Sequence, residues 1–190
     1  MDNTTTLILV AIVGLLVGGL FAMAIMRAQR SKRLRERFGP EYERIVSETG
    51  DKQKAESELE ARLAHVESLT IRPLTAEEVN RYSLQWQAVQ AEFVDEPLAS
   101  VRKADRLLQE VMKVKGYPVE DFEQRAADIS VDYPDLVTDY RGLHLIAIKE
   151  ADDEVSTEEM RQAMIHGRAL FENLVKTETA EKTVQEKEKV

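Results

Sequence analysis

The chain has 190 residues, a formal net charge of −9 and no cysteine. The absence of cysteine excludes disulfides, thiol catalysis and thiolate metal sites. The acidic balance disfavours nucleic acid as a partner, because its phosphates carry the same sign of charge. Residues 1–37 carry six basic and two acidic side chains, a balance of +4, so residues 38–190 carry −13 and favour basic partners.

The first predicted element is a transmembrane helix over residues 7–26, LILVAIVGLLVGGLFAMAIM, which contain no charged side chain. Twenty residues at helical rise cover about 30 Å, the thickness of a bilayer's hydrocarbon core. A helix also satisfies every backbone polar group inside lipid. The competing interpretation is a cleaved signal peptide, because Ala22-Met23-Ala24 resembles a cleavage site. A signal peptide needs basic residues before a shorter apolar run. The preceding MDNTTT has none, which favours an uncleaved anchor.

Six basic side chains follow the apolar run, and none precedes it. Lys and Arg flanking a membrane helix stay on the cytoplasmic side, so residues 1–6 should lie outside and residues 27 onward in the cytoplasm. The bilayer and its anionic lipid headgroups are therefore expected partners, with each basic residue contributing about 1 kcal/mol near the surface. We call these six residues the basic collar: Arg27, Arg30, Lys32, Arg33, Arg35 and Arg37.

Three small residues, Gly14, Gly18 and Ala22, fall four apart in the apolar run and share one helix face. Such a face lets two membrane helices approach closely, so it is a candidate surface for a homo-oligomer. Small residues are also simply common in membrane helices. Both interpretations stay open.

Residues 27–70 are expected to form a basic juxtamembrane segment followed by a polar helical arm. Gly39 should end the first helix, and Pro40 suits the first turn of a second helix. The heptad pattern fails near Gly50, whereas a coiled coil needs apolar core positions throughout. The sequence therefore predicts two helical pieces with a pivot near Gly50.

The pattern from residue 71 to residue 175 predicts an antiparallel bundle of four or five helices, which makes the fold all-α. The stretches LTAEEV at 74–79 and VSTEEM at 155–160 are capping boxes with Thr75 and Ser156 as N-caps. Gly116 is typical of a helix C-terminus. Apolar residues recur at three- and four-residue spacing, which predicts buried helix faces. The two clearest stripes are Val79, Tyr82, Trp86, Val89 and Phe93, and Val101, Ala104, Leu108, Val111 and Lys115.

Residues 176–190, KTETAEKTVQEKEKV, have no apolar face. A segment that cannot bury apolar surface does not compensate for the entropy of ordering. A disordered charged tail is therefore expected.

No motif indicates a catalytic or cofactor site, since the chain has no G-x-S-x-G elbow and no glycine-rich phosphate loop. The three histidines, His65, His144 and His166, fit no metal-ligand spacing. His144 and His166 lie on the last two predicted helices and could meet. Two ligands alone make a poor zinc site, so structural roles are favoured.

Four acidic residues surround the turn at Pro134. A divalent-cation site would need their oxygens to converge. Asp more often caps turns or lies on a solvated helix face, and this interpretation is favoured here. The four are Asp128, Asp132, Asp135 and Asp139.

Three stretches of the bundle resemble a known family: WQAVQAEFVDEP at 86–97, GYPVEDFEQRAADISVDYP at 116–134 and STEEMRQAMIHGRALF at 156–171. They are similar to short uncharacterised bacterial proteins, each with one N-terminal membrane segment and a helical cytoplasmic part. The resemblance covers residues 27–175 and implies a bacterial, single-pass protein, without supplying an activity or a site. In similar sequences an aromatic residue stands where this chain has Gly167. Some members are labelled secreted, which conflicts with the orientation expected from the charges.

The sequence thus favours a non-catalytic, membrane-anchored helical domain that binds an unidentified protein at the cytoplasmic face of a bacterial inner membrane, as an interaction or scaffold module. Any apolar stripe left uncovered would be its docking groove. The alternatives are an exported helical protein after signal cleavage, and an unrecognised metal-dependent enzyme built on His144, His166 and the acids near Pro134.

Overall fold

The computed structural model describes the backbone of residues 3–150 and 154–176, and the side chains of residues 14–16, 18–150 and 154–176. These residues form helices and no strand, which confirms the all-α class. The chain divides into two compact units, Met1–Leu59 and Glu60–Val190, with the boundary inside α3. Each unit is described by itself. The predicted disordered tail lies outside the described residues from residue 177 onward.

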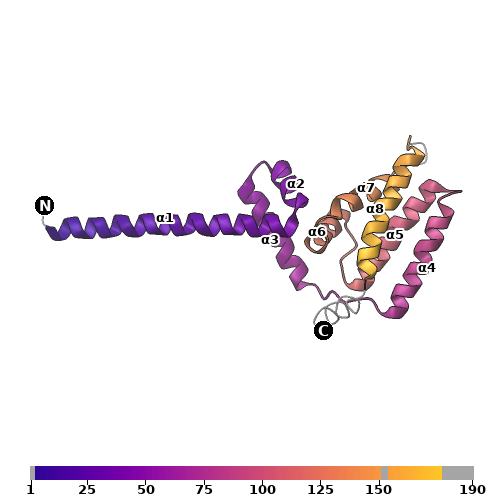
Figure 1. Ribbon diagram of the computed structural model, residues 1–190, viewed down its shortest axis with the longest axis horizontal. Coiled ribbons are helices and arrows are strands. Elements are labelled where there is room, and N and C mark those ends of the chain that lie inside the picture. Colours follow the sequence, from indigo (N-terminus) through magenta and orange to yellow (C-terminus); the bar gives the residue numbers. More distant parts are fainter. Residues whose placement is uncertain (1–2, 151–153, 177–190) are drawn as a thin grey trace, which may run out of the picture. The chain divides into compact units, whose positions relative to one another are not determined.

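The first unit contains α1 (Asn3–Phe38), α2 (Pro40–Thr49) and the beginning of α3 (Lys52–Ser68), which follow one another along the ribbon in Figure 1. The predicted break at Gly39-Pro40 is confirmed, with Pro40 in the first turn of α2. The predicted division into two helical pieces near Gly50 is also confirmed, because Gly50 ends α2 with a positive φ of 65° and α3 begins at Lys52. Its N–H donates to the Val46 carbonyl at 3.0 Å.

The core of the first unit forms where α1 meets α2 and the first turns of α3. Leu34 and Phe38 lie four residues apart on α1, so they share the face that packs against α2. The collar residues on this part of α1 lie on its exposed side. The buried apolar residues of the unit are Leu34, Phe38, Tyr42, Ile45, Ala55 and Leu59.

Among the residues that the structure describes, no helix combines the length and the apolar character that crossing a membrane requires. The apolar run of residues 7–26 belongs to α1. The side chains of residues 7–13 and 17 lie outside the described residues, so the transmembrane helix stays a prediction.

The second unit contains the end of α3 and five further helices. They are α4 (Ala76–Glu92), α5 (Pro97–Lys115), α6 (Phe122–Asp132), α7 (Val137–Ala147) and α8 (Thr157–Val175). Helix α5 contacts α4, α7 and α8, so it is the centre of the bundle (Figure 1). The predicted α5 stripe is its buried face. Its members Val101, Ala104, Leu108, Val111 and Lys115 are all buried.

Both predicted capping boxes are confirmed. The Thr75 side chain accepts a hydrogen bond from the Glu78 N–H at 3.2 Å, and the Glu78 carboxylate accepts one from the Thr75 N–H at 2.9 Å. Ser156 and Glu159 repeat this exchange at 3.2 and 2.8 Å. Each box satisfies donors that a helix N-terminus leaves without a partner inside the helix, and so fixes where α4 and α8 begin.

Gly116 ends α5 at a point where another segment of the chain crosses closely. Its φ is 106°, and a Cβ placed there would lie 2.4 Å from the Thr70 carbonyl oxygen. The Arg72 N–H donates to the Lys115 carbonyl at 2.9 Å, which ties the same segment to the end of α5. Only glycine meets both the backbone conformation and the close approach.

Gly167 of α8 lies against the ring of Trp86, which stacks on Phe171 with the ring centroids 4.6 Å apart. A Cβ at Gly167 would lie 3.0 Å from Leu143 Cδ2 and 3.3 Å from the Trp86 ring. Trp86 therefore occupies space that a larger residue at position 167 would need. The predicted core role of Trp86 is confirmed, since the side chain is buried.

Candidate functional site

The collar residues all lie on the C-terminal part of α1, and five are exposed while Arg30 is half-buried. Lys32 pairs with Glu36 at 3.7 Å, and Arg35 pairs with Glu43 at 2.9 Å. Both pairs are well exposed and so contribute little to stability. The proposed contact of the collar with lipid headgroups stays a prediction.

Gly14, Gly18 and Ala22 are exposed on α1. A Cβ added at either glycine would meet nothing within 4 Å. The face is therefore open in the single chain, and its role in self-association stays a prediction.

Each histidine pairs with a different carboxylate. Nδ1 of His144 lies 3.2 Å from Asp105 Oδ2, and Nδ1 of His166 lies 2.7 Å from Asp139 Oδ1. His65 lies 3.6 Å from Asp128 Oδ1. Within the described part of the chain, no three His, Asp or Glu side chains gather in a way that could hold a metal ion.

His144 belongs to a polar network enclosed by α5, α6 and α7. Its ring stacks on Phe122 with 3.7 Å between centroids, and its partner Asp105 also accepts a hydrogen bond from Gln109 at 2.7 Å. Asp105 was not predicted from the sequence. The available signal was a carboxylate directly beside Ala104, a position on the predicted buried stripe of α5.

A buried arginine was missed in the same way. Arg125 of α6 donates from Nε to the Tyr140 hydroxyl at 2.6 Å, and both side chains are buried. Burial raises the pKa of the Tyr140 phenol, and nearby Asp105 raises it further. The phenol therefore stays protonated at neutral pH and accepts from the guanidinium. This network joins α6 to α7 in the interior of the unit.

The acids around Pro134 have separate environments. Asp128 is fully buried and accepts from Gln124 Nε2 at 2.8 Å, and burial raises its pKa. Asp132 accepts a hydrogen bond from the buried Tyr117 hydroxyl at 2.5 Å. The interpretation as a solvated face fits the exposed Asp135 but is wrong for Asp128, whose side of α6 turns inward.

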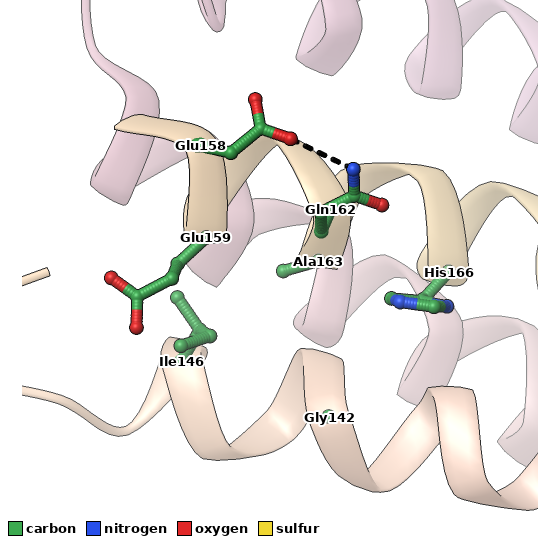
Figure 2. A pocket seen from close by; sticks show the side chains of 7 residues that line it. All are labelled: Gly142, Ile146, Glu158, Glu159, Gln162, Ala163 and His166. Atoms are coloured by element: carbon green, nitrogen blue, oxygen red, sulfur yellow. Dashed lines mark hydrogen bonds between the residues drawn. The ribbon is translucent and has the colours of Figure 1, made fainter. Parts of the chain in front are cut away.

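An open groove of about 260 Å³ lies between α7 and α8. Figure 2 shows Ala163 pointing from α8 towards α7, where Ile146 and Gly142 face it. Gly142 has no side chain, and a Cβ added there would meet nothing within 4 Å, so α7 leaves the groove open at this position. The full lining is Gly142, Ile146, Glu158, Glu159, Gln162, Ala163 and His166.

Each of the two helices also carries an exposed apolar side chain outside the groove lining. Leu145 follows Gly142 by three residues and is 59% exposed, and Ile165 follows Gln162 by three residues and is 47% exposed. Neither side chain lines the groove, whose apolar lining is Ile146 and Ala163, so Leu145 and Ile165 are further exposed apolar side chains on the same two helices. Glu158 on the groove rim is paired with Arg161 at 2.6 Å, whereas hydrogen bonds from Ser156 lower the pKa of Glu159, which contributes a negative charge to the rim at neutral pH.

Comparison with protein-family models, with curated proteins and with solved structures finds no match to this chain.

Proposed function

We propose that the protein is a non-catalytic, single-pass membrane protein whose helical bundle binds a protein partner through the α7–α8 groove. Residues 7–26 anchor it in a bacterial inner membrane, and the basic collar rests on anionic headgroups at the cytoplasmic face. The observation that carries the binding role is the open groove between α7 and α8, on two helices that also expose Leu145 and Ile165.

The anchor is supported by the sequence of α1. Twenty consecutive residues without a charge are followed at once by six basic side chains within eleven residues, 27 to 37. Moving a Lys or Arg through the hydrocarbon is costly, so this asymmetry keeps the bundle on the side where it was made. The acidic bundle is repelled by an anionic lipid surface, which leaves its groove accessible to a partner.

The occupant that fits the groove is a basic amphipathic helix. Its apolar face would cover Ile146, Ala163 and the exposed Leu145 and Ile165, as in other complexes where a helix lies in an apolar groove. Its charge follows from the ionised Glu159 on the rim and from the −13 balance of residues 38–190. Opposite charge at the rim steers association and selects against acidic partners.

Topology is tested by cysteine labelling, which is clean because the chain has no native cysteine. We place single cysteines at Asp2 and at Lys176 of the full-length chain in living cells and apply a thiol reagent that does not cross membranes. The cysteine at position 2 should be labelled in intact cells, and the one at position 176 only after permeabilisation. Labelling at position 176 in intact cells would contradict the anchor and favour export.

The binding role is tested by a photo-crosslinking residue placed in living cells at Leu145 or Ile165. The matched control is Leu84, an equally apolar side chain on α4 that is 58% exposed. One protein should be captured from positions 145 and 165, on the two helices that form the groove, and not from position 84. Its crosslinked segment should be a helix with basic residues flanking an apolar face, and Gly142→Lys, which places a positive side chain in the open space of the groove, should abolish the capture. Equal capture from all three positions, or an acidic segment at the crosslink, would contradict the proposal.

A further inference from the structure

A second depression, of about 240 Å³, lies in the first unit between α1 and the beginning of α3. Three of its lining residues belong to the turn of α1 that follows the apolar run, and three to the first turns of α3. They are Arg27, Arg30 and Ser31 from α1, and Lys52, Gln53 and Glu56 from α3. We call this depression the collar pocket.

The collar pocket has an excess of positive charge. Its lining contains three cationic side chains and one carboxylate, which leaves a balance of +2. Burial opposes ionisation of Glu56, but hydrogen bonds from Ser31 and Tyr42 at 2.6 and 2.8 Å outweigh it and leave its pKa below the usual value. The ionised Glu56 thus fixes Ser31 at the wall and lies 3.7 Å from Lys52 Nζ.

The positive charge of the collar pocket comes from side chains on both helices. Arg27 and Lys52 are exposed, with 60% of the Lys52 side chain accessible to solvent. The first amides of α3 do not contribute, because the Asp51 carboxylate already accepts from the N–H groups of Gln53 and Lys54. Any ligand is therefore held by guanidinium, ammonium and amide side chains. This is the donor set that recognises phosphate oxygens.

The position of the pocket along α1 matches the depth of lipid phosphates. Arg27 is the first residue after the apolar run, and Arg27 to Ser31 cover about 6 Å at a rise of 1.5 Å per residue. The headgroup layer on each side of a bilayer is roughly 5–8 Å thick. If residues 7–26 span the hydrocarbon, the pocket lies within that layer.

We propose that the collar pocket is a binding site for a phosphate group, held by Arg27, Arg30 and Lys52. The inference rests on the anchoring proposed above and adds a defined site to what would otherwise be diffuse attraction of the collar to anionic lipid. A guanidinium pairs with two phosphate oxygens at once, whereas the ammonium of Lys52 supplies a single compact charge from the opposite wall.

The test uses the full-length chain in a non-ionic detergent and native mass spectrometry to count bound molecules. Three probes are added separately at constant ionic strength: phosphatidylglycerol, phosphatidylcholine and inorganic phosphate. The pocket variant is Arg27→Gln with Lys52→Gln. The matched control is Arg33→Gln with Lys54→Gln, which removes the same two types of charge from α1 and α3 at exposed positions outside the pocket lining.

We expect one bound phosphatidylglycerol per chain, weakened at least tenfold in the pocket variant and less than twofold in the control. Arg27→Lys with Lys52→Arg, which keeps the charge, should retain binding within about threefold. Preference for phosphatidylglycerol identifies a lipid headgroup as the source of the phosphate, whereas binding of inorganic phosphate with the same dependence on the variants identifies a soluble source. Either result supports the site.

Equal weakening in the pocket and control variants would overturn the proposal, because binding would then follow the total charge of the collar. Unchanged binding in the pocket variant would overturn it as well. Helical content measured by circular dichroism should match the unmodified chain in every variant. The binding is measured in detergent, so failure of the labelling experiment would reject the anchor without deciding the phosphate site.

Discussion

Two glycine positions of the bundle place opposite demands on the residue that occupies them. Gly116 has a φ of 106° and lies against the Thr70 carbonyl, whereas Gly142 is in the middle of α7, where an added Cβ would meet nothing within 4 Å. The first position therefore requires glycine. The second only tolerates it, at the cost in backbone entropy that glycine imposes on a helix.

Alanine at these two positions should change stability in opposite directions. We expect Gly116→Ala to lower the free energy of unfolding by about 2 kcal/mol or more, from the left-handed backbone and the contact with Thr70. Gly142→Ala should raise it by about 1 kcal/mol. Denaturant titrations of the full-length chain in detergent, followed by circular dichroism, measure both. A Gly116→Ala chain as stable as the original would contradict the geometry at the end of α5.

The buried carboxyl group of Asp128 should make an increasingly unfavourable contribution to the free energy of unfolding as the pH rises. Burial raises its pKa, so the folded state holds the proton more tightly than the unfolded chain does. The cost of the buried carboxylate is absent well below the unfolded pKa of about 4, appears as the pH rises through that value, and persists at all higher pH. The neighbouring His65 and Arg62 oppose this shift and nearby Asp132 adds to it, but burial is the largest cause.

Asp128→Asn should therefore become increasingly stabilising relative to the original chain between pH 3 and pH 7, since the amide oxygen can still accept from Gln124. Thermal unfolding across this pH range measures the difference. Asp135→Asn, at an exposed position, is the control and should show no such trend. If the stability gained by Asp128→Asn decreased with rising pH, the assigned direction of the pKa shift would be contradicted.

Sequence patterns predicted residues whose role is local better than residues whose role depends on the packing of distant helices. The need for glycine at position 116 could be inferred from the end of one apolar stripe. The burial of Trp86 followed from its place in another stripe. The burial of Asp105, Arg125 and Asp128 was not predicted, because a charged residue is buried only when a particular neighbour compensates it. Those neighbours, His144, Tyr140 and Gln124, are identified by the fold.

At the scale of the element, the helix boundaries follow short-range chemistry. The capping boxes fixed the beginnings of α4 and α8, and Pro40 and Gly50 bounded α2, all from patterns of six residues or fewer. The groove between α7 and α8 was not predicted at any position. Periodicity shows that a helix has an apolar face, but which part of that face stays uncovered depends on how its neighbours cross it.

The capping box of α8 gives a prediction with a neighbouring control. Ser156→Ala should lower the free energy of unfolding by about 1 kcal/mol, because the Glu159 N–H loses its partner. Thr157→Ala, one residue further into the helix, removes a hydroxyl that has no capping role and should change stability by less than about 0.5 kcal/mol. The same denaturant titration compares them. Equal losses for the two variants would show that the box does not stabilise α8.

At the scale of the whole molecule, charge is divided between a basic beginning and an acidic remainder. Residues 1–37 carry +4 and residues 38–190 carry −13. The sequence alone reveals this division, and the orientation proposed for the chain depends on it. In the structure, most collar side chains are exposed and do not belong to the core of the first unit.

Reversing the charge asymmetry should reverse the orientation of the chain. We expect most molecules to invert when the six collar residues are replaced by Gln and Thr4, Thr5 and Thr6 are replaced by Arg, since the basic flank then precedes the apolar run. Adding the three arginines while keeping the collar is the control and should leave the orientation unchanged. Labelling of the cysteine at position 176 in intact cells reports the inversion. Retention of the original orientation would show that the collar does not set topology.

The stacking of Trp86 on Phe171 has a practical consequence. Trp86 is the only tryptophan in the chain, and its ring is enclosed between α4 and α8. Fluorescence excited selectively in the indole therefore originates from the bundle alone. Any ligand, mutation or lipid that shifts this emission must alter the environment of the α4–α8 contact, so the protein contains its own optical reporter for that contact.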